Sequence, residues 1–134
     1  MQKLIEKTTL YELINAGHLA RQTMLVPLAE LSLSAGDDAI LFALSEKINS
    51  SEAITQITGL QGSALTNRLL GLEKLGLIKQ KAKNISLTKK GKDVCDILIA
   101  NWEQLDEALI GELDEKNRKM LQDILKRFVK LLSL

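Results

Sequence analysis

Hydrophobic residues recur every three or four positions along most of the chain, which is the spacing of a buried helix face. This pattern predicts six helices separated by short polar breaks, over residues 2–28, 38–47, 52–58, 60–75, 89–111 and 114–132. A two-residue alternation, which is typical of strands, appears only between the fourth and fifth helices. The chain is therefore predicted to be mainly α-helical, with one small two-stranded sheet.

The first helical segment, residues 2–28, carries two apolar faces instead of one. Such a helix needs two surfaces to pack against, and one of them can belong to a second copy of the chain. Pro27 is expected to end or kink the helix near residues 25–26, because proline lacks a backbone N–H. His18 and Arg21 are either hydrogen-bonded or solvated groups at an interface edge, or a ligand- or pH-sensitive pair between subunits.

Two short helices and a longer one follow in the arrangement of a helix-turn-helix. Ser34 and Asp37 are spaced as a capping pair before the first helix, and Ser51 is expected to cap the second. Gly59 then supplies a left-handed turn residue. The side chains that we expect to face the core are Ile40, Leu41, Leu44, Ala53, Ile54, Ile57, Leu65, Leu69 and Leu72.

The solvent face of helix 60–75 carries side chains that are suited to contacts with base edges. Asparagine, glutamine and arginine can each make paired hydrogen bonds to a base, and small residues let a helix enter a major groove closely. The candidate recognition residues are Gln61, Ser63, Ala64, Thr66, Asn67 and Arg68.

A lysine-bearing hairpin is predicted directly after this helix. One strand begins at Leu77, a tight turn follows at Lys83 and Asn84, and residues 85–87 return as a second strand, with Thr88 as the cap of the next helix. Three lysines would share one face of the first strand. A lysine run is often only a solvated face, but beside a helix-turn-helix it points to phosphate contacts. The residues expected to make them are Lys79, Lys81, Lys83, Asn84, Lys89, Lys90 and Lys92.

The distribution of charge favours a nucleic-acid-facing surface at the same place. Residues 59–92 carry eight lysine and arginine residues against one glutamate, whereas residues 1–58 and 93–134 are both net acidic. The formal net charge of the whole chain, +1, hides this contrast. A basic centre between two acidic arms indicates a nucleic-acid-facing patch, and the helix-turn-helix in the same segment favours double-stranded DNA as the partner.

The two C-terminal helices carry more apolar residues than a small winged module can cover. Their stripes consist of Val94, Ile97, Leu98, Trp102, Leu105 and Leu109 in one helix, and of Leu121, Ile124, Leu125, Phe128, Leu131 and Leu132 in the other. A second copy of the chain would bury these stripes together with the first helix, which predicts a homodimer. We therefore divide the chain into an N-terminal dimerisation helix (1–31), a winged helix-turn-helix (37–92) and C-terminal dimerisation helices (93–134).

Other classes of function have little support in the sequence. The chain has one histidine, one cysteine, no glycine-rich phosphate loop and no spaced metal ligands, so we predict that it is not an enzyme and holds no metal or cofactor. Cys95 is interpreted as a partly buried small side chain rather than a redox sensor. The absence of an apolar run of roughly 18 residues and of a secretory signal predicts a cytoplasmic protein without a membrane span.

Several short stretches resemble the MarR-type (multiple antibiotic resistance regulator) transcription factors. The most specific are LEKLGLI at residues 72–78 and LTKKG at residues 87–91, and Ser63, Leu65, Thr66 and Leu69 add to the match. The order of elements also resembles this family over nearly the whole chain. The resemblance implies a homodimeric DNA-binding regulator whose two winged modules read a pseudo-palindromic site. Many members of the family are repressors that a small phenolic or lipophilic ligand, or cysteine oxidation, releases from DNA, which implies a small-molecule effector as a further partner.

Two features depart from the family pattern. The family's wing usually carries an Asp-x-Arg element whose arginine reaches the minor groove, whereas residues 81–85 contain neither residue type, so lysine contacts to phosphates are expected instead. In helix 60–75, Gly71 costs about 1 kcal/mol of helix propensity relative to alanine, and Arg68 is the only basic residue before Lys74. A second hypothesis therefore remains: a winged-helix dimer that serves as a protein-interaction module, with weak or no sequence-specific DNA binding.

Overall fold

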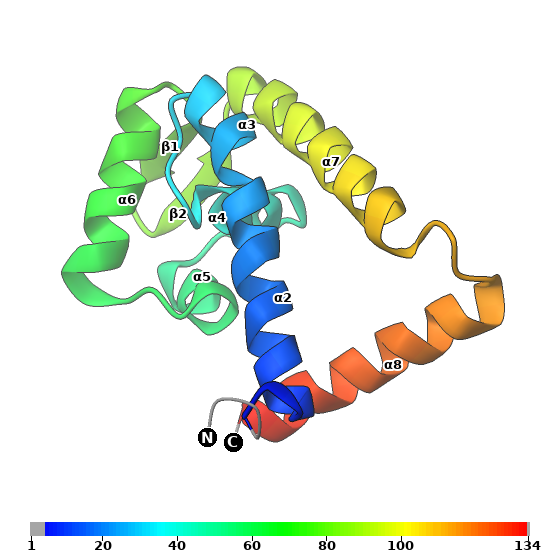
Figure 1. Cartoon of the computed structure of the whole chain (residues 1–134). Helices are drawn as coiled ribbons and strands as arrows, with labels where there is room; N and C mark the ends of the chain where they lie inside the picture. The colour runs from blue at the N-terminus through cyan, green and yellow to red at the C-terminus, as the bar shows by residue number, and fades with distance from the viewer. Residues whose placement is uncertain (1–4, 134) are drawn as a thin grey trace. The chain divides into compact units, whose positions relative to one another are not determined.

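The computed structural model describes residues 5–133 as a mainly helical protein with one small sheet (Figure 1). Residues 1–4, where the first predicted helix begins, and residue 134 lie outside the described part. In chain order the elements are α2 (Thr9–Thr23), α3 (Leu25–Glu30), α4 (Asp37–Ser45), α5 (Ser51–Thr58), α6 (Gly62–Lys74), β1 (Ile78–Lys81), β2 (Asn84–Leu87), α7 (Lys89–Ile110) and α8 (Glu115–Leu132). The predicted fold class, mainly α with a two-stranded wing, is confirmed.

The chain forms two compact units, Met1–Asn101 and Trp102–Leu134. The first unit holds α2 to α6, the sheet and the first part of α7, and the second holds the rest of α7 and α8. Among the described residues, every buried hydrophobic side chain belongs to the first unit. The folded core is therefore the core of the helix-turn-helix and its wing.

The predicted N-terminal helix is divided in two at Met24. Thr8 caps α2, because its hydroxyl oxygen accepts a hydrogen bond from the backbone N–H of Tyr11 at 3.1 Å. Pro27 stands in the first turn of α3, where a helix has no internal partner for a backbone N–H. The break predicted near residues 25–26 lies one residue earlier, at Met24, whose side chain is buried.

Helices α4, α5 and α6 form the predicted helix-turn-helix. Burial confirms the inward positions of Ile40, Leu41, Leu44, Ile54, Leu65, Leu69 and Leu72. The prediction for Ile57 is wrong, since its side chain is 52% exposed. The cap of α5 is also one residue earlier than predicted, because Ser50 and not Ser51 accepts the hydrogen bond from the N–H of Ala53. Gly59 has the predicted left-handed backbone, with φ at 77°.

The two strands pair antiparallel, with Ile78 opposite Leu87 and Lys81 opposite Asn84. The tight turn therefore consists of Ala82 and Lys83, so the turn predicted at residues 83–84 is wrong by one residue. Lys83 consequently lies in the turn and not on a strand face with the two lysines of β1. The backbone at Ala82 has φ at 56°, an unusual value for a residue with a side chain.

Backbone hydrogen bonds attach the wing to the rest of the module. The N–H of Ile85 in β2 donates to the carbonyl oxygen of Asn49, in the loop between α4 and α5, at 3.0 Å. The side chains of Ile78 and Ile85 are both buried. The wing is thus packed on the core by its apolar side chains and leaves its polar side chains exposed.

Two residues attach the start of α7 to the wing. The Thr88 hydroxyl accepts a hydrogen bond from the N–H of Gly91 at 3.0 Å, which confirms the predicted cap, and it donates to the carbonyl oxygen of Gly76. Gly91 is buried, and a Cβ atom at this position would overlap the carbonyl oxygen of Leu77. Helix α7 therefore approaches the chain before β1 more closely than any larger residue allows.

Helix α8 begins at the predicted place, because the Asp114 carboxylate caps it by accepting a hydrogen bond from the N–H of Asn117 at 2.7 Å. Most of its large apolar side chains are exposed, as are several on α2; they include Met120, Leu121, Ile124, Leu125, Val129, Leu10, Ile14 and Leu19. That a second copy of the chain covers them remains a prediction. Within residues 5–133, every helix is too short or too polar to cross a lipid bilayer.

Candidate nucleic-acid interface

Helix α6 begins at Gly62 and ends at Lys74, one or two residues inside each predicted bound. Gln61 precedes it as an N-cap whose side chain makes no capping hydrogen bond, and Gly62 has φ at 60°. The buried leucine stripe holds one side of the helix on the core. The predicted recognition residues Gln61, Ser63, Ala64, Thr66 and Asn67 are all exposed. These five residues form an uncharged surface of small or medium-sized side chains.

Arg68 differs from the other predicted recognition residues. Its side chain is 33% exposed, and its Nη1 atom donates to Oδ1 of Asp37 at 3.0 Å. Asp37 is the first residue of α4 and is almost completely buried. The only basic side chain of α6 before Lys74 is therefore bound to a neighbouring helix.

The lysines of the wing all point to solvent in the described structure. Lys79 and Lys81 lie on β1, Lys83 lies in the turn, and Asn84 begins β2. All four side chains are exposed. The wing follows α6 directly in the chain. Its three lysine residues are therefore close in sequence to the exposed residues of the helix.

Three more lysines stand in the first turn of α7, and all are exposed. The ammonium group of Lys90 donates to the carbonyl oxygen of Leu75, the C-cap residue of α6, at 3.0 Å. Positive side chains are favourable at a helix C-terminus, where carbonyl oxygens lack partners. Lys90 thus helps to hold the end of α6, whereas the ammonium groups of Lys89 and Lys92 make no hydrogen bond within residues 5–133.

Glu73 is the only acidic residue among residues 59–92. Its Oε2 atom accepts a hydrogen bond from the backbone N–H of Gln80 at 3.2 Å, which connects α6 to β1. The basic segment therefore uses its one carboxylate to position the wing.

A cavity of about 630 Å³ lies beside the wing, and it is lined by the end of α4, the following loop, β2 and α7. Its walls carry apolar side chains, including Leu44, Ile85 and Ile99, together with Lys92 and Asp96. A cavity with apolar walls and a few charged groups is suited to an amphipathic small molecule.

Cys95 also lines this cavity, but its side chain is 2% exposed and its Sγ lies 3.5 Å from the carbonyl oxygen of Leu41. Burial raises the pKa of the thiol to about 11, and the negative charge of Asp96 adds to the effect. The reactive thiolate is therefore scarce at neutral pH, which agrees with the interpretation of Cys95 as a packing residue. No three His, Cys, Asp or Glu side chains in the described range gather as a metal site.

The ion pair between Arg21 and Asp38 was not predicted from the sequence. Asp38 is fully buried, and both of its carboxylate oxygens accept hydrogen bonds from Nη1 of Arg21, at 2.8 and 3.0 Å. The only available signal was a pair of acidic residues at the start of a helix, where such residues are also common without partners.

The fold is similar to solved structures of winged-helix proteins. The Staphylococcus aureus MepR–DNA complex superposes with a TM-score of 0.81 at 20% identity, over 95% of this chain and 98% of that chain. A Mycobacterium tuberculosis MarR family protein in complex with DNA gives 0.76 at 20% identity, over 90% and 97%. CouR from Rhodococcus jostii, bound to p-coumaroyl-CoA, gives 0.81 at 17% identity, over 92% and 93%.

No protein-family model and no curated protein matches the chain. The element order, the antiparallel wing after α6 and the superpositions nevertheless agree with one another. The described chain therefore has the winged-helix fold of the MarR-family proteins.

Proposed function

We propose that this protein is a homodimeric, DNA-binding transcriptional regulator of the MarR type that acts as a repressor in the cytoplasm. Two structural neighbours are solved in complex with DNA, and both cover at least nine tenths of the chain. This similarity supports a regulator rather than an enzyme.

The observation that carries the proposal is the exposed polar face of α6 together with the exposed lysines of the wing, which follows α6 directly in the chain. In the proposed complex α6 enters the major groove, where Ser63, Thr66 and Asn67 contact base edges. Lys79, Lys81 and Lys83 contact phosphates on the flanking backbone, which fixes the position of the helix in the groove. Phosphate contacts supply affinity without sequence information, and the α6 contacts supply specificity.

The homodimer is supported by the apolar side chains that α2 and α8 leave exposed. Many large apolar side chains exposed along one helix are typical of a protein interface. A two-fold dimer presents two copies of α6, and it therefore requires a pseudo-palindromic operator whose half-sites are about one helical turn apart.

A small-molecule effector completes the proposal. The cavity beside the wing is lined by β2 and α7, so an occupant would contact elements that hold the wing in place. The ligand in the neighbouring CouR structure supports this part of the proposal by analogy.

The second candidate function, a protein-interaction module, is favoured by one observation. Arg68 is bound to Asp37, so α6 offers no unpaired cation before Lys74 to attract DNA. Under this alternative the winged-helix dimer forms but reads no operator.

Binding to duplex DNA over a series of salt concentrations tests the proposal. Each phosphate contact contributes about 0.9 to the slope of log K against log salt, so several contacts per subunit predict a dimer slope steeper than about −4. Fluorescence anisotropy with a 30-base-pair mixed-sequence duplex measures it. Absence of binding at low salt, with the protein shown to be dimeric, would support the protein-interaction module instead.

A further inference from the structure

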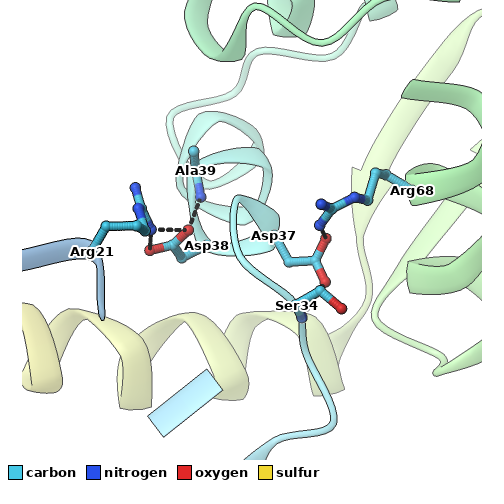
Figure 2. Close-up of polar contacts among 6 residues, drawn as sticks. All are labelled: Arg21, Ser34, Asp37, Asp38, Ala39 and Arg68. Atoms are coloured by element: carbon cyan, nitrogen blue, oxygen red, sulfur yellow. Dashed lines mark hydrogen bonds and ion pairs between the residues drawn. The ribbon is translucent and has the colours of Figure 1, made fainter. Parts of the chain in front are cut away.

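Two adjacent carboxylates at the start of α4 each bind an arginine from a different helix (Figure 2). Asp37 binds Arg68 of α6, and Asp38 binds Arg21 of α2. Figure 2 shows the two carboxylates pointing in opposite directions from the same turn. Both aspartates are buried, whereas both arginines are partly exposed.

The carboxylate of Asp37 is held in position by a hydrogen bond that is independent of Arg68. Its Oδ2 atom accepts a hydrogen bond from the backbone N–H of Ser34 at 2.8 Å, which leaves Oδ1 for the guanidinium. Asp37 also lies in the first turn of a helix, where a negative charge is favourable. A charge-assisted hydrogen bond to such an immobilised carboxylate holds the arginine in one place.

The guanidinium of Arg68 lies against the loop that precedes α4. Its Nη1 atom is 4.0 Å from the position that a Cβ atom would take on Gly36. Gly36 has φ at 93°, a conformation that residues with a side chain disfavour. Glycine is therefore favoured at this point of the loop. The Arg68 side chain thus points towards the start of α4, within the helix-turn-helix.

We infer that Arg68 is a positioning residue of the proposed DNA interface, and that it holds α6 on α4 through Asp37 without contacting a phosphate. The inference rests on the proposed function. Asp38, the residue after Asp37, binds Arg21. The same turn of α4 therefore anchors both α2 and α6. The orientation of α6 is therefore tied to α2 through two neighbouring ion pairs.

The two roles of Arg68 make opposite predictions for Asp37. If Arg68 contacts a phosphate, the Asp37 carboxylate competes with DNA for it, and its removal leaves binding equal or stronger. If Arg68 is a positioning residue, loss of Asp37 releases α6 and weakens binding. The salt slope separates the roles as well, since only a phosphate contact contributes to it.

The experiment measures the affinity of the full-length protein for one duplex over a salt series. The variants are Arg68→Gln, Asp37→Asn, their combination, and Lys81→Gln as a matched loss of one positive charge. We expect Arg68→Gln and Asp37→Asn each to weaken binding roughly tenfold, and the combination to be no weaker than the worse single variant. Their slopes should equal the wild-type slope, whereas Lys81→Gln should make it shallower by about 1.8, from two phosphates per dimer.

Two results overturn the inference: a slope for Arg68→Gln as shallow as that of Lys81→Gln, or equal or tighter binding by Asp37→Asn. Asparagine keeps an oxygen for the N–H of Ser34, so Asp37→Asn retains the local fold, and its direction of effect decides the question even if Arg68→Gln does not fold. A wild-type protein that binds no duplex overturns the proposed function instead, which is a separate outcome.

Discussion

Reversal of two wing charges, in Lys81→Glu with Lys83→Glu, is expected to weaken binding to duplex DNA at least about 1,000-fold near physiological salt. Both side chains are exposed, one at the end of β1 and the other in the turn. A dimer loses up to four phosphate contacts and gains four repulsive carboxylates. The slope of log K against log salt should become shallower by about 3.6.

The control for this variant is Lys119→Glu with Lys126→Glu, two exposed lysines on the polar side of α8. It produces the same change in net charge on α8 instead of on the wing. Equilibrium titration of both variants at one salt concentration, with thermal melting to establish folding, compares them. Equal affinities for the two double variants would mean that net charge, and not the wing, governs binding.

Gly91→Ala is expected to destabilise the fold by about 3 kcal/mol, which lowers Tm by roughly 10 °C. The new Cβ would overlap the carbonyl oxygen of Leu77 and would also come within 3.0 Å of the carbonyl carbon and 3.2 Å of Cδ2 of Leu87. The Leu77 oxygen cannot move freely, because it accepts a hydrogen bond from the N–H of Thr88 at 3.0 Å. Relief of the clash must therefore move α7 away from the wing.

Gly71→Ala is the matched control, since it adds the same methyl group to a helix. Apart from its chain neighbours and the backbone of its own helix, no atom of the described residues lies within 4 Å of a Cβ at Gly71, and alanine is favoured over glycine in a helix by about 1 kcal/mol. This variant should therefore melt a few degrees above the wild type. Circular dichroism melts of both variants measure the difference, and a Gly91→Ala protein as stable as the wild type would refute the close approach of α7.

Much of the fold could be predicted because its signals are local. The leucine stripe of α6 lies at helical spacing, Gly59 marks a left-handed turn, and Thr88 and Asp114 are cap residues next to the helices they cap. Each feature depends on residues within one or two turns. Small errors, such as the one-residue shift of the wing turn to Ala82, arise because neighbouring residues there are almost equally suitable.

The parts that could not be predicted depend on residues that are distant in sequence. Arg21 and Asp38 are 17 positions apart, and Asp37 and Arg68 are 31 apart, so no periodic pattern connects them. Ion pairs of this kind form only when the packing of the helices is known. The same limit applies to Gly91, whose need for glycine comes from the approach of another segment.

The same difference between local signals and contacts distant in sequence applies to the candidate site. Its exposed lysines could be listed from the sequence, because charge and hairpin pattern are both local. The intramolecular partners of Arg68 and Lys90 could not, and they change the role that each cation is expected to play. The exposed residues from Gln61 to Asn67, at the start of α6, are consequently uncharged, and in the proposed complex sequence reading would depend on Ser63, Thr66 and Asn67.

Selection of binding sites from random duplex DNA by the purified protein determines whether the proposed dimer reads an operator. We expect enrichment of a two-fold symmetric motif whose half-sites are centred about one helical turn, roughly 10 base pairs, apart. This spacing follows from two copies of α6 in one dimer. If the protein is dimeric in solution but enriches no motif after repeated rounds, it is not a sequence-specific regulator.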